Sequence, residues 1–143
     1  MANGDITVQV KVSGTLSGGD AIRTFDESKT FSSVADVFDR VMNVPTTEAT
    51  VLQIGTVAGA TLATWKCLVV YNMDATNFVT LGLKDTGAKS AYFRLNAGEQ
   101  FVLQRDQLEC DDDTGAVFAA FNSIDIVTAQ ADTAAVRCQV VAF

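Results

Sequence analysis

The stretch that decides the fold is residues 68–105, LVVYNMDATNFVTLGLKDTGAKSAYFRLNAGEQFVLQR. Short apolar runs alternate in it with clusters of Asn, Asp, Thr and Gly, which are typical of turns. Gly98 permits the positive φ that a tight turn needs. The runs predict four strands: Leu68–Tyr71, Phe78–Leu83, Tyr92–Leu95 and Gln100–Gln104.

The flanking segments carry the same kind of pattern. Residues 6–12 alternate between aliphatic and polar side chains, which predicts a half-buried strand with one wet face. Residues 22–31 also predict a strand. Residues 33–44 fit two structures, because Ser33 and Asp36 resemble a helical capping box, whereas Pro45 would end a strand from Asp36 to Val44. We favour the strand, since the surrounding pattern is all strand.

Turn signals recur about every ten residues, the spacing of a β-sandwich or barrel. The chain length suits one domain over residues 1–143, with no disulfide or metal needed for stability. Trp65 is expected inside. Cys67 and Cys138 lie in apolar strand-like runs and are expected to be buried thiols, which suits a reducing compartment.

Composition excludes several functions. Histidine is absent, so a Ser-His-Asp or Cys-His catalytic site is excluded. Ten Lys and Arg against seventeen Asp and Glu give a net charge of −7, which argues against binding nucleic acid. The three cysteines lack the spacing of a zinc site. We expect no export signal, no membrane segment and no cofactor.

Few side chains suggest chemistry. Asp111, Asp112 and Asp113 form the best metal candidate, because calcium prefers clustered oxygen ligands, but the EF-hand spacing is absent and a solvated turn is the alternative. Nothing selects Glu48, Glu99 or Glu109 as an acid–base pair. Tyr92 and Phe78 lie on the more polar faces of their strands. They are therefore the aromatics most suited to contacting a partner.

One pattern resembles small virion proteins of tailed bacteriophages. In residues 70–82, VYNMDATNFVTLG, an apolar strand ends in Asn-x-Asp-x-x-Asn and a second strand ends in glycine. A segment like Phe93–Glu99 follows, and Arg40–Ala49 fits the hairpin that precedes the pattern. The resemblance covers residues 40–99. It implies an antiparallel β-sandwich, jelly-roll-like, with about eight to ten strands.

The resemblance also implies a role. We expect no enzymatic activity but a structural virion protein, most simply a capsid-associated decoration protein that docks on the major capsid protein or other virion proteins. We expect a homo-oligomer assembled in the host cytoplasm. The alternative is a tail or fibre component that binds a receptor or carbohydrate. Partner contacts are expected at Phe118, Phe121 and Tyr92, and in the loops at residues 55–63 and 111–121.

Overall fold

The computed structural model describes residues 3–14, 25–54, 62, 65–85, 90–105, 108–110, 119–121 and 124–143. These residues form antiparallel strands and no helix, which confirms the predicted all-β class. The twelve strands described are β1 (Gly4–Val12), β2 (Phe25–Val34), β3 (Phe38–Val44), β4 (Ala49–Gln53), β5 (Leu68–Asn72), β6 (Val79–Lys84), β7 (Ser90–Leu95), β8 (Gln100–Leu103), β9 (Leu108–Cys110), β10 (Ala119–Phe121), β11 (Ile126–Ala131) and β12 (Val136–Ala142).

The chain divides into two compact units, Met1–Ala35 and Asp36–Phe143. The first is the hairpin of β1 and β2, which pair only with each other among the described strands. The second is a β-sandwich. The sequence predicted a single sandwich domain over residues 1–143, and that stays a prediction. The alternating pattern of β1 identified a strand but carried no information about which sheet it would join.

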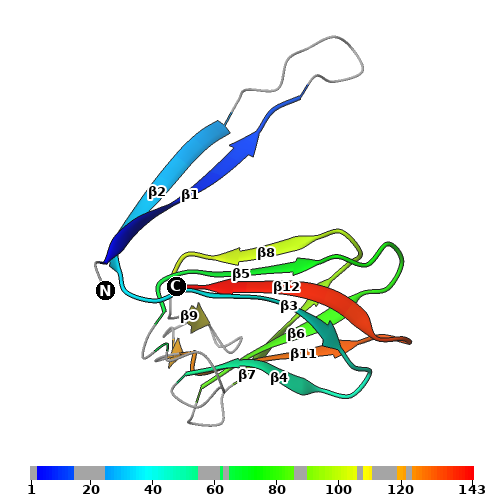
Figure 1. The fold of residues 1–143 in the computed structure, drawn as a ribbon. Coiled ribbons are helices and arrows are strands. Elements are labelled where there is room, and N and C mark those ends of the chain that lie inside the picture. Colours follow the sequence, from blue (N-terminus) through cyan, green and yellow to red (C-terminus); the bar gives the residue numbers. More distant parts are fainter. Residues whose placement is uncertain are drawn as a thin grey trace. The chain divides into compact units, whose positions relative to one another are not determined.

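The sandwich consists of two four-stranded sheets that lie face to face in Figure 1. One sheet has the order β3-β12-β5-β8, and the other has the order β4-β11-β6-β7. Pairing is nested along the chain: β6 pairs with β7, β5 with β8, β4 with β11 and β3 with β12. The hairpin of β9 and β10 is inserted between β8 and β11.

Most consecutive strands of the sandwich belong to different sheets. The turn at residues 73–78 joins β5 to β6, and the turn at 96–99 joins β7 to β8, each across the sandwich. The sequence predicted a hairpin at Arg40–Ala49, and that prediction is wrong, because β3 and β4 also belong to different sheets. A hairpin and an arch between sheets need the same turn residues and the same flanking alternation, so the sequence pattern does not distinguish them.

The core lies between the two sheets and is filled by alternate residues of each strand. Trp65 is 1% exposed, and its indole N–H donates to the Ile124 carbonyl at 2.9 Å, as a buried indole requires. Cys67 and Cys138 are buried and outside any disulfide, which confirms the prediction of buried thiols. The outward residues of β5, Val69 and Tyr71, are only half-buried, so the outer face of this strand is partly open.

The ambiguous segment at residues 33–44 is strand, as favoured. β2 ends at Val34 and β3 begins at Phe38, with three residues between them. Ser33 has a φ of 58°, where a helical capping residue would be extended. Pro45 follows β3 directly, and its carbonyl accepts a hydrogen bond from the Ala131 amide at 2.8 Å.

The predicted turn chemistry after β5 is confirmed in part. Asn72 Oδ1 accepts from the Asp74 amide at 3.0 Å, and Asp74 Oδ1 accepts from the amides of Thr76 and Asn77 at 2.8 and 2.7 Å. The bonds from the Asn77 and Thr76 amides lower the pKa of the Asp74 carboxyl group. Gly98 has the predicted positive φ, 73°. Among the described residues Ser33 is the sole non-glycine residue at positive φ, so Asn77 does not use the left-handed conformation that its residue type tolerates.

Asn72 joins the two sheets at this end of the sandwich. Its side chain is fully buried, and Nδ2 lies within hydrogen-bonding distance of the carbonyls of Asn77 (2.9 Å), Leu95 (3.1 Å) and Asn96 (3.1 Å). Its backbone bonds both Gly98 and Glu99. One amide therefore holds the β5–β6 turn and the β7–β8 turn together, a role that its position in the sequence pattern did not reveal.

Candidate functional site

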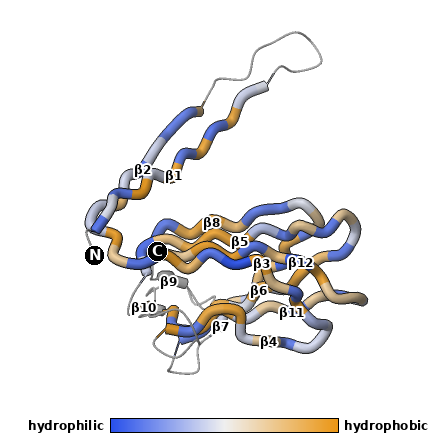
Figure 2. The backbone as a smooth tube through the Cα atoms, viewed as in Figure 1, coloured by the Kyte–Doolittle hydropathy of each residue, from blue (hydrophilic) through white to orange (hydrophobic). Residues whose placement is uncertain are grey.

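The β1–β2 hairpin has one apolar face that its own two strands leave open. Directly paired residues of an antiparallel ladder point to the same side. The register therefore places Ile6 beside Phe31, Val8 beside Lys29, Val10 beside Glu27 and Val12 beside Phe25. We call these eight side chains the hairpin face. Figure 2 shows hydrophobic and hydrophilic residues alternating along β1.

Exposure increases along the hairpin face. Val10, Val12 and Phe25 are 40%, 51% and 50% exposed, whereas Phe31 is buried. The sequence predicted that the apolar side of this strand would be half-buried, and its outer half is instead open. Contiguous exposed apolar side chains mark interaction sites more often than single scattered ones do.

The opposite face of the hairpin is polar throughout. Thr7 and Thr30 share a hydrogen bond of 3.0 Å, and Gln9 donates to Asp26 at 2.6 Å. Lys11 lies beside Asp26 in the register. An isolated two-stranded hairpin is marginally stable in water, so the side-chain pairs on this face help to hold the register while the hairpin face stays open.

A second apolar surface lies on the outer face of the sheet β3-β12-β5-β8. Val102, Val69 and Val141 are direct neighbours across β8, β5 and β12. Val41 of the edge strand β3 is also exposed; it lies opposite Gln139, and Asp39 is the β3 residue directly opposite Val141. We call these four residues the valine patch. Valines on a strand face that water reaches are suited to packing against another protein.

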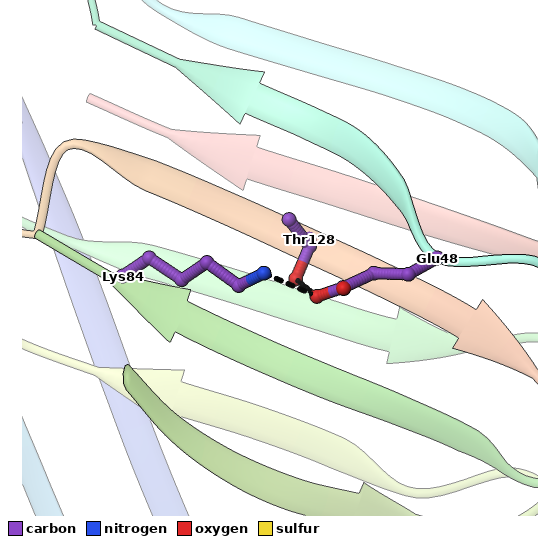
Figure 3. Close-up of polar contacts among 3 residues, drawn as sticks. All are labelled: Glu48, Lys84 and Thr128. Carbon is purple, nitrogen blue, oxygen red and sulfur yellow. Dashed lines mark hydrogen bonds and ion pairs between the residues drawn. The ribbon is translucent and has the colours of Figure 1, made fainter. Parts of the chain in front are cut away.

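The outer face of the other sheet carries a polar cluster, shown in Figure 3. Glu48 Oε1 accepts from Lys84 Nζ at 2.6 Å and from the Thr128 hydroxyl at 2.6 Å. Hydrogen bonding from Lys84, and then from Thr128, lowers the pKa of Glu48. The same bond to Glu48 raises the pKa of Lys84. Glu48 precedes β4, Lys84 ends β6 and Thr128 lies in β11, so the sheet order brings them together.

Tyr92 lies beside this cluster. Its ring covers Gly82, because a Cβ at Gly82 would lie 2.9 Å from the ring and 2.4 Å from Thr128 Oγ1. The ring is also 5.6 Å from the Lys84 ammonium, and the side chain remains 54% exposed. Gly82 therefore lets an exposed aromatic ring lie across the sheet beside a carboxylate, an ammonium and a hydroxyl group.

Phe78, which precedes β6, is covered by a cation. The Arg94 guanidinium lies 3.9 Å from the centroid of the half-buried Phe78 ring, and its Nε donates to Asn96 Oδ1 at 2.9 Å. Of the two aromatics that the sequence selected, Tyr92 is thus the one that offers an open surface.

The other sequence-predicted site residues have different outcomes. Asp111, Asp112, Asp113 and Phe118 lie outside the described residues, as does most of the loop at 55–63. Phe121 belongs to β10, but its side chain is likewise outside the description. Glu99 accepts from the Asn96 amide at 2.7 Å in the β7–β8 turn, and bonds from Asn96 lower its pKa. Glu48 and Glu99 therefore take part in different contacts. Calcium binding by Asp111, Asp112 and Asp113 stays a prediction, because these residues lie outside the described part of the chain.

No grouping of three His, Cys, Asp or Glu side chains suited to a metal ion occurs in the described ranges. A helix able to span a membrane is likewise not found in that part of the chain. Comparisons with protein-family models, curated proteins and solved structures found no match for this chain.

Proposed function

We propose that the chain is a structural virion protein of a tailed bacteriophage, without enzymatic activity, that acts by docking on other proteins. The observation that carries the proposal is the hairpin face, whose Val10, Val12 and Phe25 side chains are left open to water. Exposed apolar surface lowers solubility unless a partner covers it. A protein that keeps such a surface is best suited to assembly.

The nested strand pairing supports the same role. A long antiparallel hairpin that rolls up produces nested pairs and two four-stranded sheets, which is the jelly-roll arrangement, and we propose that the sandwich is a jelly roll. Jelly rolls occur in viral capsid proteins and lectins. Together with the resemblance of residues 40–99 to virion proteins, this favours a capsid-associated position.

The net charge of the chain bears on where in a virion the protein would lie. The net charge of −7 opposes contact with packaged DNA, so the proposed location is outside the shell or along the tail. The valine patch offers a second surface on the sandwich, so two docking surfaces of one chain could bind different neighbours in a particle.

The proposal is tested by measuring binding of the purified full chain to emptied capsids of its phage. Phe25→Asp places a charge on the hairpin face and should abolish binding. Thr7→Asp places the same charge on the polar face of the same hairpin and should leave binding intact. Equal binding by both variants would show that this face has no part in docking, and absence of binding by the wild type would contradict the capsid-associated role.

The second candidate function is carbohydrate binding, as in a tail or fibre component. The exposed Tyr92 ring with the Glu48 and Lys84 groups at its edge favours it, because sugars present apolar faces and hydroxyl edges together. A glycan array probed with wild type and Tyr92→Ala tests this function. Binding that disappears in the variant would support it, and an array without any binding would remove it.

A further inference from the structure

The charges on the hairpin face indicate what covers it. Lys29 and Glu27 are the two charged residues of this face, and they are one row apart on the same strand. The Lys29 ammonium lies 4.9 Å from the centroid of the Phe31 ring, so this cation lies over the face. The four rows, in order, are Ile6–Phe31, Val8–Lys29, Val10–Glu27 and Val12–Phe25.

This order of rows is complementary to itself under a two-fold rotation. The axis lies in the interface, runs across the strands and passes between the Val8–Lys29 and Val10–Glu27 rows. A second hairpin placed by this rotation sets its Glu27 against Lys29, its Lys29 against Glu27, and its Val10 against Val8. At the two ends, Val12 and Phe25 come opposite Ile6 and Phe31.

We propose that the occupant of the hairpin face is the hairpin face of a second copy of this chain, packed face to face about that two-fold axis. In an isologous interface, if residue i of one copy contacts residue j of the other, then j of the first copy contacts i of the second. The two central rows meet this requirement, because Lys29 faces Glu27 in both directions and Val8 likewise faces Val10. The proposal rests on the proposed assembly role: two copies paired through this face present two sandwiches to the particle, so pairing strengthens capsid binding and the loss of pairing in Phe25→Asp removes that gain.

The size of the face sets the strength of the pairing. Strand spacing of about 4.8 Å and a rise of about 3.4 Å per residue give the eight side chains roughly 250 Å² of flat sheet. A standard stable interface buries about 800 Å² on each partner. Phe31 is already buried in one copy, so at each end of the paired faces the surface left to bury belongs mainly to Val12 and Phe25. Pairing is therefore weak for two free chains and effective where many copies are held together.

The experiment is sedimentation equilibrium of the full chain at about 0.1–1 mM, where weak association is populated. Glu27→Lys alone or Lys29→Glu alone sets like charges against each other at both symmetric contacts. Each should weaken self-association about tenfold or more. An equimolar mixture of the two variants restores opposite charges at both contacts and should associate as strongly as the wild type. The double variant Glu27→Lys with Lys29→Glu should also self-associate.

Lys11→Glu is the matched control, because it makes the same change of charge on the polar face of the hairpin. It should leave self-association unchanged, and mixed with Glu27→Lys it should restore less than Lys29→Glu does. A wild type that stays monomeric, or single reversals without effect, would overturn the inference. If that monomer still binds capsids through Phe25, the assembly role stands and only the self-pairing falls; if it binds nothing, both fall.

Discussion

Replacement of Asn72 by alanine is the perturbation that most directly probes how the sandwich is held together. The side chain is fully buried and takes part in four contacts: Oδ1 with the Asp74 amide, and Nδ2 with three carbonyls. A hydrogen bond contributes about 1 kcal/mol net, and a buried group left without a partner costs about 1–3 kcal/mol. Two of the three carbonyls are partly accessible and can bond water, so the total loss should be about 3 kcal/mol.

Urea denaturation followed by Trp65 fluorescence measures this loss, because Trp65 is the single tryptophan and is buried in the core. With a slope typical of this size, the midpoint should fall by roughly 1–2 M. Asn72→Asp keeps the shape but sets a carboxylate against three carbonyls, so it should be less stable still at neutral pH. Asn43→Ala, on an exposed position of β3, should change stability by less than about 0.5 kcal/mol. An Asn72→Ala variant as stable as Asn43→Ala would show that Asn72 does not hold the two turns together.

Three further outcomes are expected. Gly82→Ala should destabilise the sandwich by about 1–3 kcal/mol in the same assay, because its Cβ would come within 2.4 Å of Thr128 Oγ1. Lys84 holds the pKa of Glu48 below its ordinary value in the folded protein. The pair therefore stabilises the fold at pH values above the pKa of unfolded Glu48, and this contribution is lost as the pH falls through the lower pKa of the folded state. Glu48→Gln lacks this contribution and should lose less stability on acidification than the wild type. Burial raises the pKa of the Cys138 thiol to about 11, so iodoacetamide at neutral pH should label it, by peptide mass spectrometry, only after unfolding.

The sequence predicted what depends on neighbouring residues. Alternating side chains identified the strands, apolar context placed Trp65 and the thiols Cys67 and Cys138 inside, and the Asn-x-Asp spacing identified the turn after β5. Each of these follows from local chemistry: side-chain period, hydrophobic burial, and hydrogen bonds of a side chain to its own backbone.

What the sequence did not reveal depends on the order of strands in the sheets. Glu48, Lys84 and Thr128 meet only because β4, β11 and β6 are neighbours. The role of Asn72 between two turns likewise needs the fold. The run at residues 25–31 carried a weaker signal, because Phe25 and Phe31 flank five polar residues. Its pairing with residues 6–12 is what defines the hairpin face.

The most direct test of self-pairing and docking is the mass of the full chain in solution across a concentration series, compared with that of Phe25→Asp. We expect the wild type to shift from monomer to larger species as concentration rises, while the variant stays monomeric and its sandwich unfolds at the same urea concentration. A wild type and a variant with identical monomer masses over the whole series, and no capsid binding by either, would contradict both self-pairing and docking.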